Sequence, residues 1–179
     1  MDSPERIETE RLLLRWPTEA DAAEMFARYA QDPEVCRYMS WTTHRSISET
    51  IAFVQWSIER RQAGSSYGWL IYPLAGGSLL GSIGFRVNGH EVQFGYCLAR
   101  DAWGHGYATE ASRAIVDLAL SDPAIWRIQA YCDVGHRASA RVLQKAGLVL
   151  EGTLRRHVVL PNLGEVPRDV YLYARVRES

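Results

Sequence analysis

A glycine-rich segment at residues 100–111, RDAWGHGYATEA, holds the residue types and spacing that point most directly to chemistry. Gly104 and Gly106 bracket His105, after a segment typical of a strand and before one typical of a helix. The first turn of a helix presents backbone N–H groups without partners in the helix, together with about half a positive charge. Glycines there let the backbone approach an anion closely, so the segment indicates a phosphate or pyrophosphate site. The alternative is a tight turn that binds nothing.

Two other phosphate loops do not match this segment. A dinucleotide fingerprint needs a third glycine at the position of Thr109, and no acidic strand end follows at the expected distance. A nucleoside triphosphate loop needs Gly-Lys-Ser/Thr, which the sequence lacks.

The composition restricts the class of protein. The 179 residues are 47% hydrophobic and 23% charged with a net charge of -1, which favours one globular domain over residues 1–179 and no nucleic-acid partner. Cys36, Cys97 and Cys132 lie far apart, and the five histidines show no metal-ligand spacing, so neither a disulfide framework nor a metal site is expected. The charged N-terminal segment and the lack of a long apolar run predict a cytoplasmic protein without a membrane span.

Hydrophobic periodicity and turn residues predict the elements that position the glycine segment. A strand in residues 9–17 precedes a helix that opens at Thr18 and Asp21, which resemble a capping box. A second helix covers residues 46–61, with Ile47, Ile51, Val54 and Ile58 at helical spacing. Strands follow at residues 67–74, 79–87 and 91–98, a helix from the glycines to about 120, a strand at 126–133, a helix at 139–146, and a hairpin of 148–160 and 166–177.

The predicted order is therefore βααβββαβαββ, a mixed α/β (α+β) fold. The short turns predict antiparallel strands, while the strand–helix–strand unit around the glycines predicts one parallel pair inside a mostly antiparallel sheet. An exposed edge expected for the C-terminal strand would allow a homodimer.

Six motifs in this order make the chain resemble the GNAT superfamily of acyl-CoA N-acyltransferases, and within it the RimJ/RimL-like branch. The resemblance covers nearly the whole chain. It rests on TERLLLR at 9–15, GSIGF at 81–85, FGYCL at 94–98, WGHGYATEA at 103–111, ASARVLQKAGL at 138–148 and EGTLR at 151–155.

The resemblance implies that the sheet splays where it holds acetyl-CoA and that the hinge amides bind the coenzyme A pyrophosphate. Asp101 stands where the family has Gln or Arg, and we expect it to cap the helix. The side chains of Tyr96 and Leu98 are expected to pack in the core, with backbone groups of residues 95–98 lining the thioester. The expected cofactor-binding residues are Tyr96, Cys97, Leu98, Trp103, Gly104, His105, Gly106, Tyr107, Ala108, Thr109, His136 and Ser139.

Transfer of an acyl group from a thioester to an amine needs a neutral amine, a stabilised oxyanion and a proton for the departing thiolate. The tyrosine that some relatives use as the acid is replaced by Leu143. The RimJ/RimL-like branch has Asn-x-x-Ser, and here His136 and Ser139 occupy those two positions. Ser139 is the expected proton donor, and a helix N-cap is the alternative role.

The general base is less well defined. Gln93 stands where relatives often have Glu, and Glu91 lies on the same strand face two residues earlier. Glu91 is the expected base, directly or through water, and a solvated carboxylate beside the hairpin turn is the alternative. Glu110 is expected to be an exposed helix residue.

The expected acceptor-binding residues are Tyr38, Trp41 and Gln93, between the first two helices and on the strand before the glycines. An α-amino group with a pKa near ~8 is about one-tenth neutral at pH 7, and a lysine near ~10.4 is neutral in about one molecule in a few thousand. A weak base therefore favours a peptide N-terminus as acceptor, as the resemblance also does. A small-molecule amine as acceptor and a non-catalytic coenzyme A-binding module are the alternatives.

Overall fold

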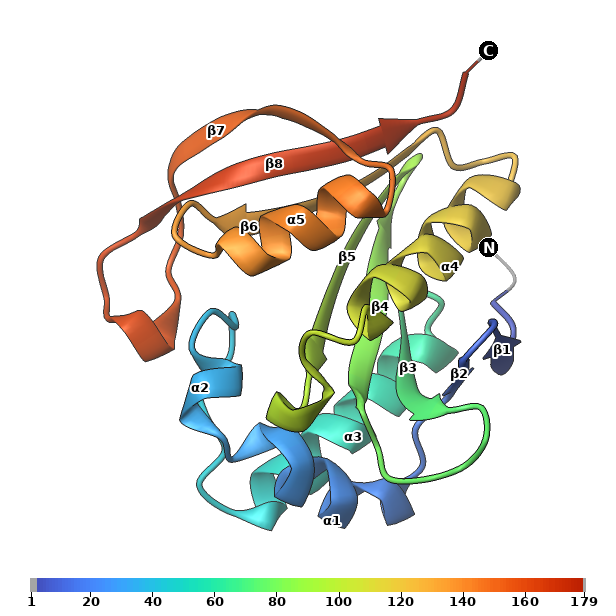
Figure 1. Ribbon diagram of the computed structural model, residues 1–179, viewed down its shortest axis with the longest axis vertical. Helices are drawn as coiled ribbons and strands as arrows, with labels where there is room; N and C mark the ends of the chain where they lie inside the picture. Colours follow the sequence, from blue (N-terminus) through green and yellow to red (C-terminus); the bar gives the residue numbers. More distant parts are fainter. Residues whose placement is uncertain (1–2, 179) are drawn as a thin grey trace.

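The strands form one eight-stranded sheet in the order β1-β2-β3-β4-β5-β6-β8-β7 (Figure 1). A computed structural model describes residues 3–178. The strands are β1 (Arg6–Glu8), β2 (Leu12–Arg15), β3 (Ser66–Pro73), β4 (Gly81–Asn88), β5 (Glu91–Leu98), β6 (Arg127–Asp133), β7 (Val149–Val158) and β8 (Arg168–Val176).

One pair in this sheet, β5 with β6, is parallel, and the other neighbouring strands are antiparallel. The mixed α/β fold with a mostly antiparallel sheet is therefore confirmed. The parallel pairing runs through three residue pairs, from Glu91–Arg127 to Gln93–Gln129. Beyond Gln93, β5 continues along β4 while β6 continues along β8, so the two strands part.

Helices cover both faces of the sheet. They are α1 (Ala22–Met25), which continues as the wider turn η2 (Phe26–Ala30), α2 (Pro33–Cys36), α3 (Ile47–Gln62), α4 (Tyr107–Ser121) and α5 (Arg137–Lys145), with short 3-10 turns η1 (Glu19–Asp21), η3 (Arg100–Ala102) and η4 (Pro161–Leu163). Among residues 3–178, no helix is long and apolar enough to cross a membrane.

Two cores fill the space between these layers. The larger core packs α4 and α5, through residues such as Ile115 and Leu143, against one face of the sheet. The smaller core packs Met25 and Val54 against the other face, with Leu70 of β3. α4 and α5 therefore lie on the opposite face of the sheet from α1 and α3 (Figure 1).

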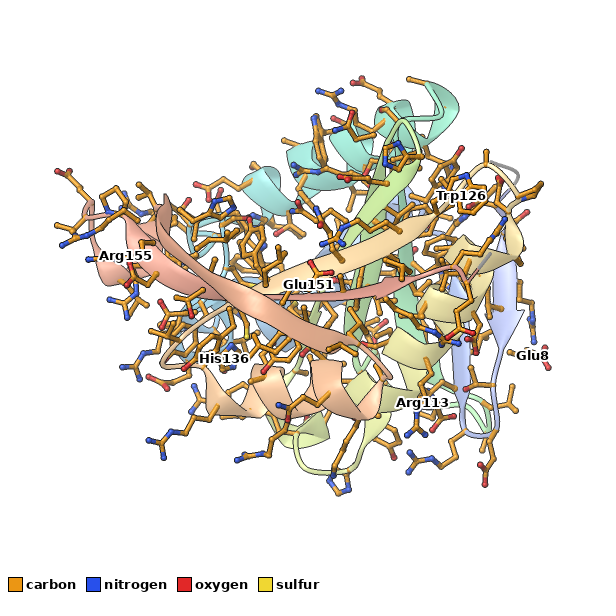
Figure 2. All side chains as sticks on the ribbon, turned by 90° about the horizontal axis from the view of Figure 1, so that it is seen from above. Glu8, Arg113, Trp126, His136, Glu151 and Arg155 are labelled. Atoms are coloured by element: carbon orange, nitrogen blue, oxygen red, sulfur yellow. The ribbon has the colours of Figure 1, made fainter. Side chains whose placement is uncertain are left out.

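Most predicted element boundaries lie close to the observed ones, and three features differ from expectation. β1 pairs with β2 and was not expected as a separate strand. Of the four apolar residues at helical spacing in α3, Val54 and Ile58 pack into the smaller core, while Ile47 and Ile51 are 42% and 37% exposed. The C-terminal strand β8 lies between β6 and β7, so the exposed edge belongs to β7, which reaches along the outside of the sheet (Figure 2).

Candidate active site

A cavity of about 320 Å³ opens where β5 and β6 part. Its lining includes the end of β5, from Gln93 to Cys97, the end of β6, from Ala130 to Asp133, and Ser139 at the start of α5. Parting strands leave backbone N–H and C=O groups along the gap without partners in the sheet, so the gap can hold an extended polar chain.

Tyr96 and Ser139 face each other across this gap. Their hydroxyl oxygens lie 2.9 Å apart, within hydrogen-bond distance. Burial raises the pKa of Tyr96 above its usual range, although the hydrogen bond with Ser139 opposes that shift. Tyr96 therefore keeps its proton at neutral pH. Its ring packs against the larger core, as expected, and its hydroxyl in addition reaches Ser139. Leu98 is buried, as expected.

The first turn of α5 places Ser139 inside the helix. The helix begins at Arg137 with His136 at the N-cap position, so the alternative in which Ser139 is the N-cap is also wrong. The hydroxyl is then available for the cavity, which it lines.

His136, the N-cap residue of α5, also lines the cavity. Its ring stacks on that of Tyr38, with centroids 4.2 Å apart and planes inclined by 12°. Burial lowers the His136 pKa, although the nearby Asp133 carboxylate opposes that shift. The imidazole is therefore neutral around pH 7. Asp133 accepts hydrogen bonds from the Arg168 guanidinium and from the backbone N–H of Gly135.

The glycine hinge has the backbone expected of an anion site. Gly104 and Gly106 have φ of +81° and +82°, and Gly106 is the N-cap residue of α4. A Cβ on Gly104 would meet nothing within 4 Å, so the backbone is open to a ligand there. Asp101 does not cap the helix, because its carboxylate pairs with Arg28 at 2.8 Å.

Glu110 fixes the hinge to the N-terminal strands. Its carboxylate accepts hydrogen bonds from Thr9 Oγ1 at 2.6 Å and from the backbone N–H of Arg11 at 2.8 Å, and it forms an ion pair with the Arg11 guanidinium. Arg11 also donates to the backbone oxygen of His105. The expectation of an exposed helix residue is wrong, because Glu110 joins α4 to the turn between β1 and β2.

The remaining hinge residues surround the start of α4. Trp103 Nε1 donates to the Leu98 backbone oxygen at 2.8 Å, so the indole closes the end of β5 while remaining 46% exposed. The rings of His105 and Tyr107 stack with centroids 5.6 Å apart. Ala108 and Thr109 lie in the first turn of α4.

Glu91 is not brought into this group. It lies at the first position of β5 beside the hairpin turn, with His90 Nε2 at 3.8 Å, and it is not among the cavity-lining residues. Gln93 does line the cavity, on the face of β5 opposite Tyr96. The surroundings of Glu91 match the alternative of a solvated carboxylate.

Tyr38 and Trp41, the expected acceptor-binding residues, both line the cavity. Asn162 of η4, in the turn of the C-terminal hairpin, holds the segment that carries them. Its Nδ2 donates to the backbone oxygens of Cys36 and Trp41 at 2.7 and 2.8 Å, and its Oδ1 accepts from the Thr43 backbone N–H at 3.1 Å. In Figure 1, η4 accordingly lies beside α2.

Two buried thiols also line the cavity. Burial raises the pKa of Cys97 to about 12 and that of Cys132 to about 11. Since the thiolate is the nucleophilic form, neither side chain is poised to accept an acyl group at neutral pH. Residues 3–178 contain no group of three or more His, Cys, Asp or Glu side chains that could hold a metal ion.

A splayed parallel strand pair, a glycine hinge at a helix N-terminus and a hydroxyl pair at the gap define the architecture of an acyl-CoA transferase. Residues 11–149 match the family model described as acetyltransferase (GNAT) domain. The chain belongs to the GNAT acetyltransferase family, and it is an acyltransferase that uses acetyl-CoA.

Relatives cover nearly the whole chain. YkkB of Bacillus subtilis (strain 168) is 31% identical over 163 residues, which is 87% of this chain and 92% of YkkB. The N-acetyltransferase YoaA of the same organism is 30% identical over 174 residues, which is 96% of each chain.

Solved structures share the fold at lower identity. The microcin C7 self-immunity acetyltransferase MccE, in complex with acetyl-CoA and AMP, superposes with a TM-score of 0.86 at 22% identity over 98% of both chains. RimL, the ribosomal L7/L12 α-N-protein acetyltransferase, in complex with coenzyme A, has a TM-score of 0.85 at 23% identity over 96% of this chain and 98% of that one.

Proposed function

We propose that the protein, as one GNAT domain over residues 1–179, transfers an acetyl group directly from acetyl-CoA to the N-terminal α-amine of a protein or peptide. RimL, whose fold the chain shares, is a protein α-N-acetyltransferase, which supports the proposal.

The observation that carries the proposal is the composition of the cavity. Among its described lining residues, Asp133 is the only carboxylate. That carboxylate already accepts hydrogen bonds from the Arg168 guanidinium and the Gly135 backbone N–H. The cavity histidines His44 and His136 both have pKa values lowered by burial. A site with only weak bases favours an amine that is already partly neutral, and an α-amine with a pKa of about 8 meets that need far better than a lysine.

Each residue of the site then has a defined role. Acetyl-CoA supplies the activated acetyl group, and the hinge at Gly104 and Gly106 holds its pyrophosphate. Ser139 holds a proton at Oγ for the departing sulfur, and Tyr96 orients that hydroxyl. A backbone N–H within residues 95–98 polarises the acyl oxygen.

A small-molecule amine is the second candidate. The described lining residues enclose a cavity of about 320 Å³ with aromatic walls, which would suit a small apolar acceptor. MccE, a self-immunity acetyltransferase, has the same fold.

Release of coenzyme A thiol from acetyl-CoA separates the two candidates. The acceptors are short peptides with free or blocked N-termini and matched small amines, assayed with the wild-type protein and with Ser139→Ala. We expect turnover with free peptide N-termini that a blocked N-terminus abolishes. Turnover with small amines alone would overturn the peptide assignment.

A further inference from the structure

Three glycines lie in a row across the sheet beside the active site. In the strand register, Gly68 of β3 is opposite Gly84 of β4, and Gly84 is opposite Gly95 of β5. Residues opposite each other in a sheet point to the same face, which here is the face toward α3, because a Cβ on Gly68 would lie 3.6 Å from Ser57 Oγ of that helix. Three adjacent strands therefore carry no side chain along one line, and all three glycines line the cavity.

The row is covered by α3 at Gly68, is tightly packed at Gly84 in the middle, and is open at Gly95. A Cβ on Gly84 would come within 2.6 Å of the Tyr67 backbone oxygen, so glycine is required there for the close approach of the strands. A Cβ on Gly95 would meet nothing within 4 Å, so unfilled space begins at β5. Gly95 is adjacent to Tyr96, which marks the reacting end of the cavity. We call the line Gly68, Gly84 and Gly95 the glycine trough.

An aromatic wall from α3 faces the trough. Phe53 and Trp56 line the cavity, their rings stack with centroids 5.9 Å apart, and the side chains are still 38% and 37% exposed. Such exposure of two stacked aromatic residues inside a cavity is what an apolar ligand would cover.

Two arginines lie beside Trp56 in the aromatic wall. The guanidinium carbon of Arg86, which lines the cavity, is 6.0 Å from the centroid of the Trp56 ring, and that of Arg60 is 5.6 Å from it. Burial lowers the His44 pKa, so this neighbour of Phe53 is neutral around pH 7. The trough therefore disfavours a second cationic group on the acceptor.

We propose that the glycine trough and the aromatic wall of Phe53 and Trp56 form a subsite for a flat apolar group, such as an aromatic ring, carried by the acceptor next to its reacting amine. For peptides this inference rests on the proposed function and assigns it a preference for an aromatic first residue. A flat ring fits because the floor consists of backbone alone, while the wall offers ring faces for stacking.

Filling the trough tests the proposal. Gly95→Ala and Gly95→Val add side-chain atoms to open space at a position without left-handed φ, so the strand can keep its conformation. Gly152→Ala and Gly152→Val in β7 are the matched controls, because a Cβ there also meets nothing within 4 Å and Gly152 lies outside the cavity lining. Two pairs of acceptors are compared. One pair is a peptide that starts with Phe and a peptide that starts with Ala, and the other is 2-phenylethylamine and ethylamine.

We expect the wild-type protein to prefer the aromatic member of each pair by about tenfold or more in kcat/KM. Gly95→Val should reduce that preference to within about threefold, and Gly95→Ala should have an intermediate effect; the ratio within each acceptor pair is the readout, because a change in the acetyl-CoA step affects both members of a pair alike. Both Gly152 variants should keep the wild-type ratio. An unchanged ratio in Gly95→Val, or no aromatic preference in the wild-type protein, would overturn the proposal.

The wall is tested separately with Trp56→Ala. Trp126→Ala is its control, because Trp126 is also exposed, also lies beneath an arginine and is remote from His136 (Figure 2). Calorimetric binding of 2-phenylethylamine to the protein saturated with coenzyme A should weaken about tenfold in Trp56→Ala and stay unchanged in Trp126→Ala. This binding measurement does not depend on turnover. If peptides prove not to be acceptors, the expected difference in 2-phenylethylamine binding would still hold. Equal binding of 2-phenylethylamine to both variants would reject the subsite.

Discussion

The hydroxyl oxygens of Tyr96 and Ser139 lie 2.9 Å apart, and the bond between them joins β5 to α5 across the gap in the sheet. The two residues are 43 positions apart in the sequence, and each comes from a different side of the cleft. The Tyr96 hydroxyl, which stays protonated at neutral pH, restricts the orientation of the Ser139 hydroxyl by hydrogen bonding to it. The pair can therefore present a proton in one direction within the cleft.

Ser139→Ala should lower kcat by about 100-fold, because it removes the proposed proton donor. Tyr96→Phe should lower kcat by about five- to tenfold, the value of one orienting hydrogen bond of about 1 kcal/mol. The double variant should be no slower than Ser139→Ala alone, because Tyr96 acts through Ser139. Tyr173→Phe is the control, since it removes another largely buried hydroxyl, which pairs with Gln144. Additive losses would refute the coupling.

Gly104→Ala should weaken coenzyme A binding. The left-handed backbone at Gly104 is strained for alanine by about 1–2 kcal/mol, and the added methyl group occupies the open side of the hinge. Gly76→Ala is matched to it, because Gly76 has φ of +87° and also has nothing within 4 Å of its Cβ position. Calorimetry and thermal unfolding should give a similar stability loss in both variants and a binding loss in Gly104→Ala alone. Equal coenzyme A affinities would remove the hinge from the binding site.

Asn162→Ala should lower the free energy of unfolding by about 2 kcal/mol, because the carbonyls of Cys36 and Trp41 and the N–H of Thr43 lose their partner. It should also raise the KM for the acceptor more than the KM for acetyl-CoA, because the loop walls the acceptor side. Glu165→Ala, an exposed change in the same loop, should alter neither quantity. Urea unfolding and steady-state kinetics measure both effects.

Asp21 should make stability depend on pH in the acid range. Burial alone would raise its pKa, but hydrogen bonds from Arg15 and Thr18 outweigh burial and lower the pKa to about 2. The stability that ionised Asp21 contributes is therefore fully present above the pKa of about 3.9 that an Asp has in the unfolded chain, and it is lost as the pH falls toward 2.

At pH 7, Asp21→Asn should lower the free energy of unfolding by about 1–2 kcal/mol, and the difference should shrink between pH 4 and 2. Asp117→Asn, at an exposed carboxylate 3.4 Å from Arg175, should change stability by less than about 0.5 kcal/mol. A difference that persists to pH 2 would contradict the linkage.

Incubation with acetyl-CoA and no acceptor should leave the protein mass unchanged. Cys97 and Cys132 line the cavity with pKa values raised to about 12 and about 11, so both remain thiols at pH 7. Intact-mass spectrometry detects an added acetyl group directly. An adduct that maps to either cysteine would replace direct transfer with a covalent intermediate.

Sequence reasoning predicted the elements whose signals are local. Alternating residues and short glycine turns gave β3 to β6 to within two residues, and the Thr18–Asp21 capping box is present. The glycine hinge was also predicted, because left-handed backbone at Gly104 and Gly106 is a property of those residues themselves.

Features that depend on distant partners were missed. The Tyr96–Ser139 bond and the contacts of Asn162 join segments that only the folded sheet brings together. Ile47 and Ile51 of α3 are exposed although they share helical spacing with the buried Val54, because apolar residues occupy more than one flank of that helix and periodicity alone does not identify the flank that faces the sheet. Glu110 was misjudged for a similar reason, since its partners Thr9 and Arg11 come from about 100 residues earlier in the chain.

The strand order also determines when the sheet can form. β8 is the last of the eight strands to be synthesised, yet it lies between β6 and β7. Until β8 leaves the ribosome, β6 keeps an unpaired edge beyond its short ladder with β5, and β7 has no partner at all. The native pairing of this half of the sheet, which carries Ser139 on its neighbouring helix, therefore depends on β8, and the wall that β6 gives to the cleft is supported only once that strand is in place.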